Sequence, residues 1–290
     1  MMLYDALIGP FADFEFMRRA LVGVLALALG AGPVGVFLML RRMSLVGDAM
    51  AHAILPGAAL GFLLAGLNLF AMTAGGLIAG FAVALLAGFV ARSTGLKEDA
   101  SLAAFYLLSL ALGVTIVSLK GTNIDLLHIL FGAVLALDDQ ALFLLAGVST
   151  VSMAVLALIY RPLVLECVDP TFLRSVSRAG GPTHIAFLAL LVLNLVGGFQ
   201  ALGTLLAVGL MMLPAAAARF WAGDITNMIM IATGMAILSG YAGLLVSFHA
   251  GAPSGPAIIL AAGGIYAVSV LFGRVGGMLR QAFPGRHLEA

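Results

Sequence analysis

Asp48 and His52 are the residues of this chain whose types and spacing best suit metal chemistry. They lie four residues apart in an apolar segment that ends at Pro56-Gly57, so on a helix both side chains share one face. A carboxylate oxygen and an imidazole nitrogen make half of a transition-metal site. Imidazole suits zinc, iron, nickel and copper, and carboxylate extends the range to manganese. The alternative is a structural Asp–His hydrogen bond, but ionisable groups within apolar spans are costly and favour a functional role.

Two further histidines are weaker candidates for metal ligands. His128 follows Asp125 just outside an apolar segment, where collecting metal at the entrance competes with a solvated or packing role. His249 lies near the end of another apolar segment, before a run rich in Pro and Gly, and a gating role and a structural role are equally open. His184 is expected to be an interface residue near the inner end of a span.

The composition predicts the environment in which these residues work. Of the 290 residues, 63% are hydrophobic and 9% are charged, and the mean hydropathy is +1.17. Soluble chains are near half apolar and a quarter charged. We therefore expect an all-α, polytopic membrane protein in which residues 1–290 form a single transmembrane domain. The net charge of +1 gives no reason to expect a nucleic-acid partner.

Nine apolar segments approach the length of about 20 residues that a spanning helix needs. They are Ala20–Leu40, Ala49–Gly66, Phe70–Val90, Leu102–Leu119, Ala141–Tyr160, Ile185–Gly198, Ala201–Phe220, Met228–Phe248 and Ala257–Phe272. Ile129–Leu137 is too short to span and is expected to be a re-entrant or edge helix.

The distribution of lysine and arginine predicts the orientation. With nine spans and a cytoplasmic C-terminus, the outer side holds only Arg18, Arg19 and Lys120, so 14 − 3 = 11 basic residues lie inside. The Arg18-Arg19 pair argues against this placement locally, but the total favours it. We expect the N-terminus outside and the C-terminus in the cytoplasm.

The segment 161–182 is the longest inner loop and carries its own helix signals. Asp169 is a good N-cap and Pro170 suits the first helical position, whereas Gly180-Gly181-Pro182 predicts a stop. We interpret residues 169–179 as a short amphipathic helix that either lies parallel to the membrane or docks into a partner protein. The residues expected to act in coupling are Asp169, Pro170, Phe172, Leu173, Val176, Arg178 and Gly180.

No ATP-hydrolysing motif accompanies this helix. A phosphate-binding loop needs Gly-x-x-x-x-Gly-Lys-Ser/Thr, and the two lysines, Lys97 and Lys120, do not lie in that frame. The chain is therefore expected not to be an enzyme, with any ATPase on a separate polypeptide. An intramembrane metalloenzyme would need a pattern such as His-Glu-x-x-His, and His52 has no such partner.

Several blocks, in order along nearly the whole chain, resemble the zinc/manganese/iron-type ABC importer permease family. They are Leu38–Gly57, Asp125–Ala136, Asp169–Phe172 with Arg178–Gly181, Gln200–Ala218 and Pro253–Pro256. The resemblance implies a homodimeric permease in the bacterial cytoplasmic membrane. It also implies an ABC ATPase dimer on the cytoplasmic side, a metal-loading solute-binding protein outside, and no permanently bound cofactor.

The same resemblance assigns a role to the first pair of residues. Asp48 and His52 match the family positions thought to contact the metal during transport. An acidic residue that the family often has before the last Pro-x-Gly turn is missing, and His249 stands nearby. This difference favours zinc as the transported metal, with manganese or iron as the alternatives. A proton-coupled secondary metal transporter is the rival reading.

Overall fold

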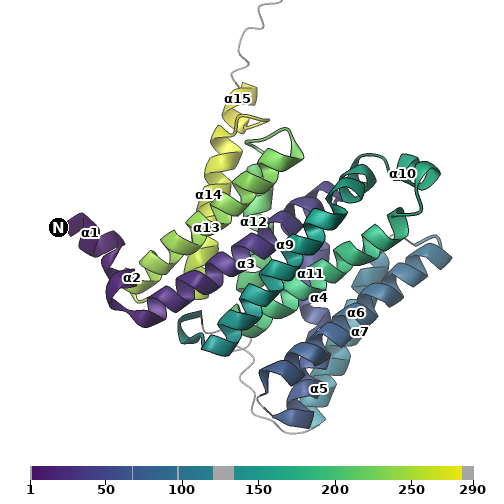
Figure 1. Cartoon of the computed structure of the whole chain (residues 1–290), viewed down its shortest axis with the longest axis horizontal. Helices are drawn as coiled ribbons and strands as arrows, with labels where there is room; N and C mark the ends of the chain where they lie inside the picture. The colour runs from purple at the N-terminus through teal and green to yellow at the C-terminus, as the bar shows by residue number, and fades with distance from the viewer. Residues whose placement is uncertain (1, 67, 97, 120–133, 283–290) are drawn as a thin grey trace, which may run out of the picture.

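The computed structural model describes residues 2–66, 68–96, 98–119 and 134–282, and within these ranges every regular element is a helix (Figure 1). The helices before the first long gap are α1 Met2–Leu7, α2 Gly9–Asp13, α3 Glu15–Leu40, α4 Ser44–Ala53, α5 Leu55–Ala65, α6 Leu69–Ser93 and α7 Glu98–Leu119. Those after it are η1 Val134–Ala136, α9 Asp139–Val168, α10 Pro170–Val176, α11 Gly180–Leu202, α12 Thr204–Ala218, α13 Ile225–Ala250, α14 Ser254–Phe272 and α15 Met278–Ala282.

Each of the nine expected spans coincides with helix, and eight described helices are long and apolar enough to cross a membrane. The stretch Leu45–Ala65 counts as one span although α4 and α5 are separated at Ile54. The ninth, α12, has 15 residues, which at 1.5 Å per residue is about 22 Å and shorter than the hydrocarbon core. The expected edge helix at 129–137 lies mostly outside the described residues, and only η1 is seen at its end.

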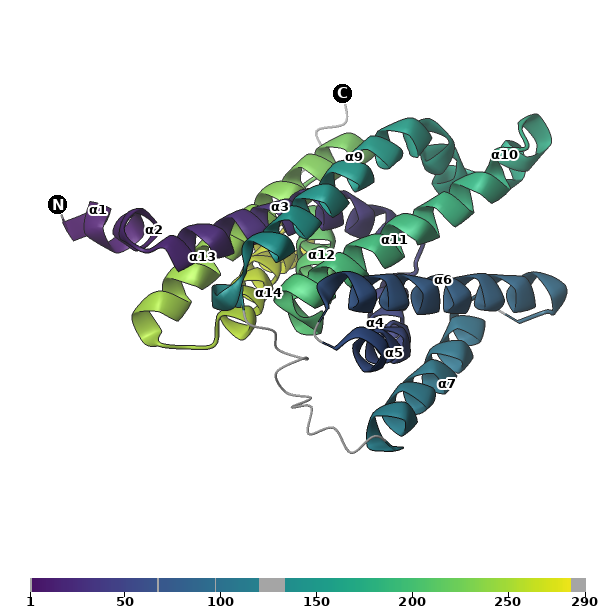
Figure 2. The same ribbon diagram turned by 60° about the horizontal axis from the view of Figure 1, so that its bottom comes forward.

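The most buried helices, α3 and α11, lie at the centre of the molecule. Helix α3 contacts α9, α12 and α13, and α11 contacts α9, α12 and α6. Helices α5, α6 and α7 pack on one another as a group on one side, and α6 joins this group to α11 (Figure 1, Figure 2). Helix α4 lies between this group and the centre, since it contacts α7, α11 and α12. Helix α4 therefore contacts both parts of the protein.

Glycines make the close contacts inside the group of α5, α6 and α7. A Cβ on Gly57 would lie 2.0 Å from the carbonyl oxygen of Gly75, and one on Gly61 would lie 2.4 Å from that of Ala71. Backbones can approach in this way only where side chains are absent. The Gly-x-x-x-Gly face of α5 is therefore used for packing within the chain.

The loop expected at 161–182 is shorter than predicted at both ends. Helix α9 continues through Pro162 to Val168, because Leu163 is fully buried in the core and this packing outweighs the local preference of proline. The short helix α10 ends at Val176, three residues before the expected end. Pro182 does not follow a helix stop: it lies in the first turn of α11, where a missing N–H costs nothing.

Candidate metal path and coupling helix

Asp48 and His52 lie on one face of α4, as their spacing predicts. Asp48 Oδ1 is 3.9 Å from His52 Nε2, which is an ion-pair distance and too long for a hydrogen bond. The Asp48 side chain is 70% exposed and that of His52 is 32% exposed. Leu45, one turn earlier on the same face, is also exposed. The pair therefore opens onto a face of α4 that the described part of this chain leaves uncovered.

Helix α7 supports the end of α4 immediately after His52. The Tyr106 ring lies 6.4 Å from the imidazole of His52, centroid to centroid. One turn on, Ser109 Oγ donates a hydrogen bond of 2.8 Å to the carbonyl oxygen of Ala53. Gly113 follows at the next turn, and a Cβ there would lie 3.1 Å from the nitrogen of Pro56. One stripe of α7 thus holds the junction of α4 and α5 that positions His52.

The other two histidine candidates do not join this site. His128 lies outside the described residues. His249 is exposed in the last turn of α13, and its Nδ1 is 2.9 Å from the carbonyl oxygen of Leu245, four residues earlier. Groups of three or more potential ligands placed to hold a metal ion are absent from the described part of the chain. Asp48 and His52 are therefore two potential metal ligands at α4, without a third among the described residues.

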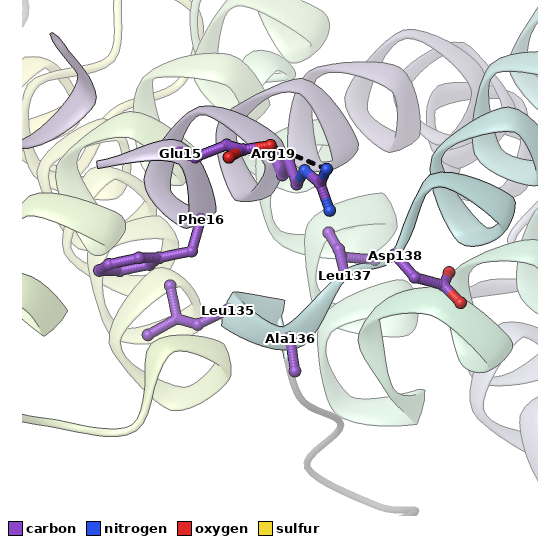
Figure 3. A pocket seen from close by; sticks show the side chains of 7 residues that line it. All are labelled: Glu15, Phe16, Arg19, Leu135, Ala136, Leu137 and Asp138. Atoms are coloured by element: carbon purple, nitrogen blue, oxygen red, sulfur yellow. Dashed lines mark ion pairs between the residues drawn. The ribbon is translucent and has the colours of Figure 1, made fainter. Parts of the chain in front are cut away.

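At the start of α3, an open pocket of about 480 Å³ contains a compensated charge (Figure 3). It is lined by Glu15, Phe16, Arg19, Leu135, Ala136, Leu137 and Asp138. Arg19 Nη2 is 2.8 Å from Glu15 Oε1 and 3.2 Å from Asp139 Oδ1. These carboxylates offset the positive charge of Arg19. Arg19 is one of the two arginines whose position argued against an N-terminus on the outer side.

Asp169 caps α10 as its sequence position predicts. Its Oδ1 accepts hydrogen bonds from the backbone nitrogens of Phe172, at 2.9 Å, and Thr171, at 3.0 Å. The bond from Phe172, followed by those from Thr171, lowers the pKa of the Asp169 carboxyl from its ordinary value. The carboxylate therefore stays ionised and holds the first turn of α10 at neutral pH.

The two neighbouring apolar residues of α10 point in different directions. Leu173 is buried and would be 3.6 Å from a Cβ on Gly180, so it packs against the start of α11. Phe172 is half-exposed and Arg178 is exposed in the following loop. The side chains of Pro170 and Val176 lie outside the described part of the structure. Leu173 therefore anchors α10, and Phe172 is the apolar side chain available to a partner.

A buried charged cluster at the same end of the molecule has no single local signal in the sequence. Arg41 Nη2 is 3.2 Å from Glu166 Oε1 and 2.5 Å from His184 Nδ1. These residues lie 125 and 143 positions apart. Arg41 is one of the basic residues expected on the inner side, and His184 was expected to be an interface residue. Only their location near predicted inner ends of spans hinted that they could meet.

Comparison with known proteins identifies the family of this helical membrane protein. Residues 13–273 match the model of the ABC 3 transport family. The chain belongs to this family. The manganese import system permease protein ScaB of Streptococcus parasanguinis is 33% identical over 262 residues, which cover 90% of this chain and 92% of the relative. The manganese transport system membrane protein MntC of Halalkalibacterium halodurans is 30% identical over 278 residues, 96% of this chain and 94% of the relative.

A solved structure shows that this ABC 3 family permease also shares the fold of its relatives. The structure of PsaBC from Streptococcus pneumoniae in complex with Fab superposes with a TM-score of 0.84 at 28% identity, covering 97% of this chain and 100% of that one. The resemblance to metal-type ABC importer permeases is thus confirmed, as is the expectation of a transport subunit rather than an enzyme. A multi-pass permease of this kind belongs in the bacterial cytoplasmic membrane.

Proposed function

We propose that this permease carries manganese across the membrane and that Asp48 and His52 are transient ligands on its path. The observation that carries the proposal is the pairing of the exposed Asp48 carboxylate with the partly exposed His52 on an apolar span. A carboxylate facing lipid would be costly, so this face of α4 needs protein or water beside it. We infer that a second copy of the chain supplies that cover and contributes its own pair. Four loosely arranged ligands open to water would bind a divalent ion and release it.

Two arguments favour manganese over zinc. The relatives ScaB and MntC are named for manganese, and a carboxylate ligand accommodates manganese well. The preference for zinc depended on His249, whose imidazole instead contacts the Leu245 carbonyl at the end of α13. Manganese therefore replaces zinc as the expected cargo.

We also propose the partners that such an importer requires. A cytoplasmic ABC ATPase dimer would contact α10 through Phe172 and Arg178, and an extracytoplasmic solute-binding protein would deliver the metal. The capped, anchored geometry of α10 supports this proposal because a rigid helix passes on movement with little loss. Asp169, Leu173 and Gly180 would hold the helix in place rather than touch the ATPase.

Uptake of Mn²⁺, Zn²⁺ and Fe²⁺, measured separately in proteoliposomes with the permease and its ATPase, tests the proposal. Asp48→Asn and His52→Ala should each reduce Mn²⁺ uptake by more than about tenfold, as loss of a metal ligand does, while the ATPase still copurifies. His249→Ala is the matched histidine control and should transport normally. Near-normal Mn²⁺ uptake by the Asp48→Asn/His52→Ala double variant would show that the pair is structural, and preferred uptake of Zn²⁺ would overturn the choice of metal.

A further inference from the structure

The cluster of Arg41, Glu166 and His184, here called the inner clamp, joins three helices at the end of the molecule that bears α10. The exposed fractions of the side chains are 11%, 14% and 8%. Arg41 also lies over the ring of Phe187, 5.1 Å from its centroid. Because a guanidinium only donates hydrogen bonds, the contact with Arg41 requires His184 Nδ1 to be the acceptor. The geometry of the cluster is therefore specific for these residue types.

Stability alone is a poor explanation for the inner clamp. Arg41 Nη1 and Glu166 Oε2 are buried without a hydrogen-bond partner among the described residues. The desolvation of a buried ion pair offsets much of its Coulomb attraction, and apolar side chains of similar volume often stabilise a protein as well or better. Buried polar groups without partners call for an explanation other than stability, and a functional role is one such explanation.

Two members of the inner clamp flank the coupling loop, defined here as residues 169–179. Glu166 lies in the last turn of α9, three residues before the Asp169 cap of α10. His184 lies in the second turn of α11, which begins directly after the loop. Leu173 also packs beside the start of α11. A force on α10 is thus applied to the two helix ends that hold Glu166 and His184.

The third member is rigidly connected to α4. Arg41 is the C-cap of α3, and Arg42 follows with φ 58°, the left-handed conformation. Met43 N donates to Leu38 O at 2.9 Å and Arg42 N donates to Met39 O at 3.1 Å, which is the bond pattern of a Schellman motif. Helix α4 starts at the next residue. A displacement of Arg41 is therefore passed directly to the helix of Asp48 and His52.

We propose that the inner clamp couples movement of the coupling loop to α4, so that ATPase movements at α10 shift the metal-path pair. Arg41, Glu166 and His184 act as positioning residues in this inference, which rests on the proposed function. The clamp is the described charged contact that links α3 with both helices flanking the loop. Breaking it should separate ATP hydrolysis from transport without removing either the ATPase or the metal ligands.

The double variant Arg41→Met/Glu166→Gln tests this in the complete transporter. It removes both charges together and leaves neither partner as an unpaired buried charge. We expect the ATPase to copurify and hydrolyse ATP, while Mn²⁺ uptake per ATP falls by about tenfold, the scale of a typical coupling free energy. Arg161→Gln, an exposed arginine of α9, is the matched control and should leave this ratio unchanged. An unchanged ratio in the double variant would overturn the inference.

A second readout separates the inner clamp from the metal assignment. Cys167 is the one cysteine of the chain, so Cys167→Ser allows a single label at Leu45→Cys. Leu45 lies on the face of α4 that is exposed in the single chain and that the second copy is proposed to cover, so its access to the label reports movement of α4. With an intact clamp, ATP should change the labelling rate at this position; with Arg41→Met/Glu166→Gln it should not. An ATP-dependent change that persists contradicts the clamp whatever ion is carried. Loss of the change while Asp48→Asn still transports would support the clamp and reject the metal ligands.

The milder variant Glu166→Asp covers the case in which the double variant does not fold. It keeps the charge but shortens the side chain by one methylene, which lengthens the 3.2 Å contact with Arg41. We expect a folded transporter with reduced Mn²⁺ uptake per ATP and a smaller ATP-dependent change in labelling at Leu45→Cys. Wild-type values of both quantities in Glu166→Asp would overturn the inference.

Discussion

Ser109 shows how one small side chain supports the proposed metal path. Its hydroxyl donates to the carbonyl oxygen of Ala53, the residue after His52. Ser101, two turns earlier on α7, makes the same kind of bond to Ala87 of α6 at 2.9 Å. Both serines are buried. The two residues therefore form a natural pair for comparing a bond near the metal path with one remote from it.

Ser109→Ala and Ser101→Ala should each destabilise the protein by about 1 kcal/mol, the usual worth of one internal hydrogen bond. Thermal denaturation in detergent measures this. Only Ser109→Ala should also raise the KM for Mn²⁺, because it loosens the junction that positions His52. Equal KM values in the two variants would mean that the Ser109 bond has no special effect on the metal path.

Asp169 stabilises α10 as its N-cap, and the lowered pKa of its carboxyl sets how this stabilisation depends on pH. A carboxyl with a lowered pKa in the folded state contributes stability above its ordinary value of 3.8, and this contribution is lost as the pH falls through the folded-state pKa. ATPase copurification should therefore be constant across neutral and mildly acidic pH. Asp169→Ala should weaken it throughout that range, and Asp169→Asn, which can still accept the capping bonds, should weaken it less. Copurification that declines already near neutral pH would contradict this account.

At the scale of helices, the contact of α5 with α6 depends on missing side chains. Gly57→Ala would place a Cβ 2.0 Å from the Gly75 carbonyl oxygen, and relief of this overlap should cost about 1–3 kcal/mol. Gly88→Ala on α6 is the control, because a Cβ there meets nothing within 4 Å. Denaturation temperatures in detergent should fall for Gly57→Ala and stay the same or rise for Gly88→Ala. Equal denaturation temperatures of the two variants would show that α5 and α6 accommodate the added methyl group at Gly57 without loss of stability.

The boundaries of α9, α10 and α11 show where helix signals succeed and where they fail. The cap at Asp169 was predictable, since it depends on residues two and three positions away. The role of Pro182 was not, because proline is compatible with the region after a helix and with the first turn of another. The helix through Pro162 depends on the burial of Leu163 by other helices. Local sequence cannot decide such cases.

For the whole molecule, the orientation in the membrane remains a prediction. The basic residues favour a cytoplasmic C-terminus, and Arg19 is offset by Glu15 and Asp139. A green fluorescent protein fused to the C-terminus should fluoresce in cells, and alkaline phosphatase fused after Ala250, at the end of α13, should be active. The reverse pattern of the two reporters would invert the topology and place α10 outside, away from any cytoplasmic ATPase.

The class of the protein, its helical spans and the Asp48–His52 pair could all be predicted from local sequence. A bilayer requires each spanning helix to satisfy its own backbone, so hydropathy over about 20 residues identifies each span without knowledge of the others. The pairing of Asp48 with His52 requires only one turn of helix. Such properties depend on neighbours a few residues away and can be predicted from one chain.

Contacts between residues far apart in the chain could not be predicted and are known from the folded structure. It brought Arg41 to Glu166 and His184 and placed Ser109 at the end of α4. It also left the face of Asp48 uncovered by the described part of the chain. It also showed α12 to be short and the Gly57 face to be used within the chain. Hydropathy and helical periodicity report whether a residue lies in a span and on which face. They do not specify which other helix lies against that face, because this depends on the packing of the whole bundle.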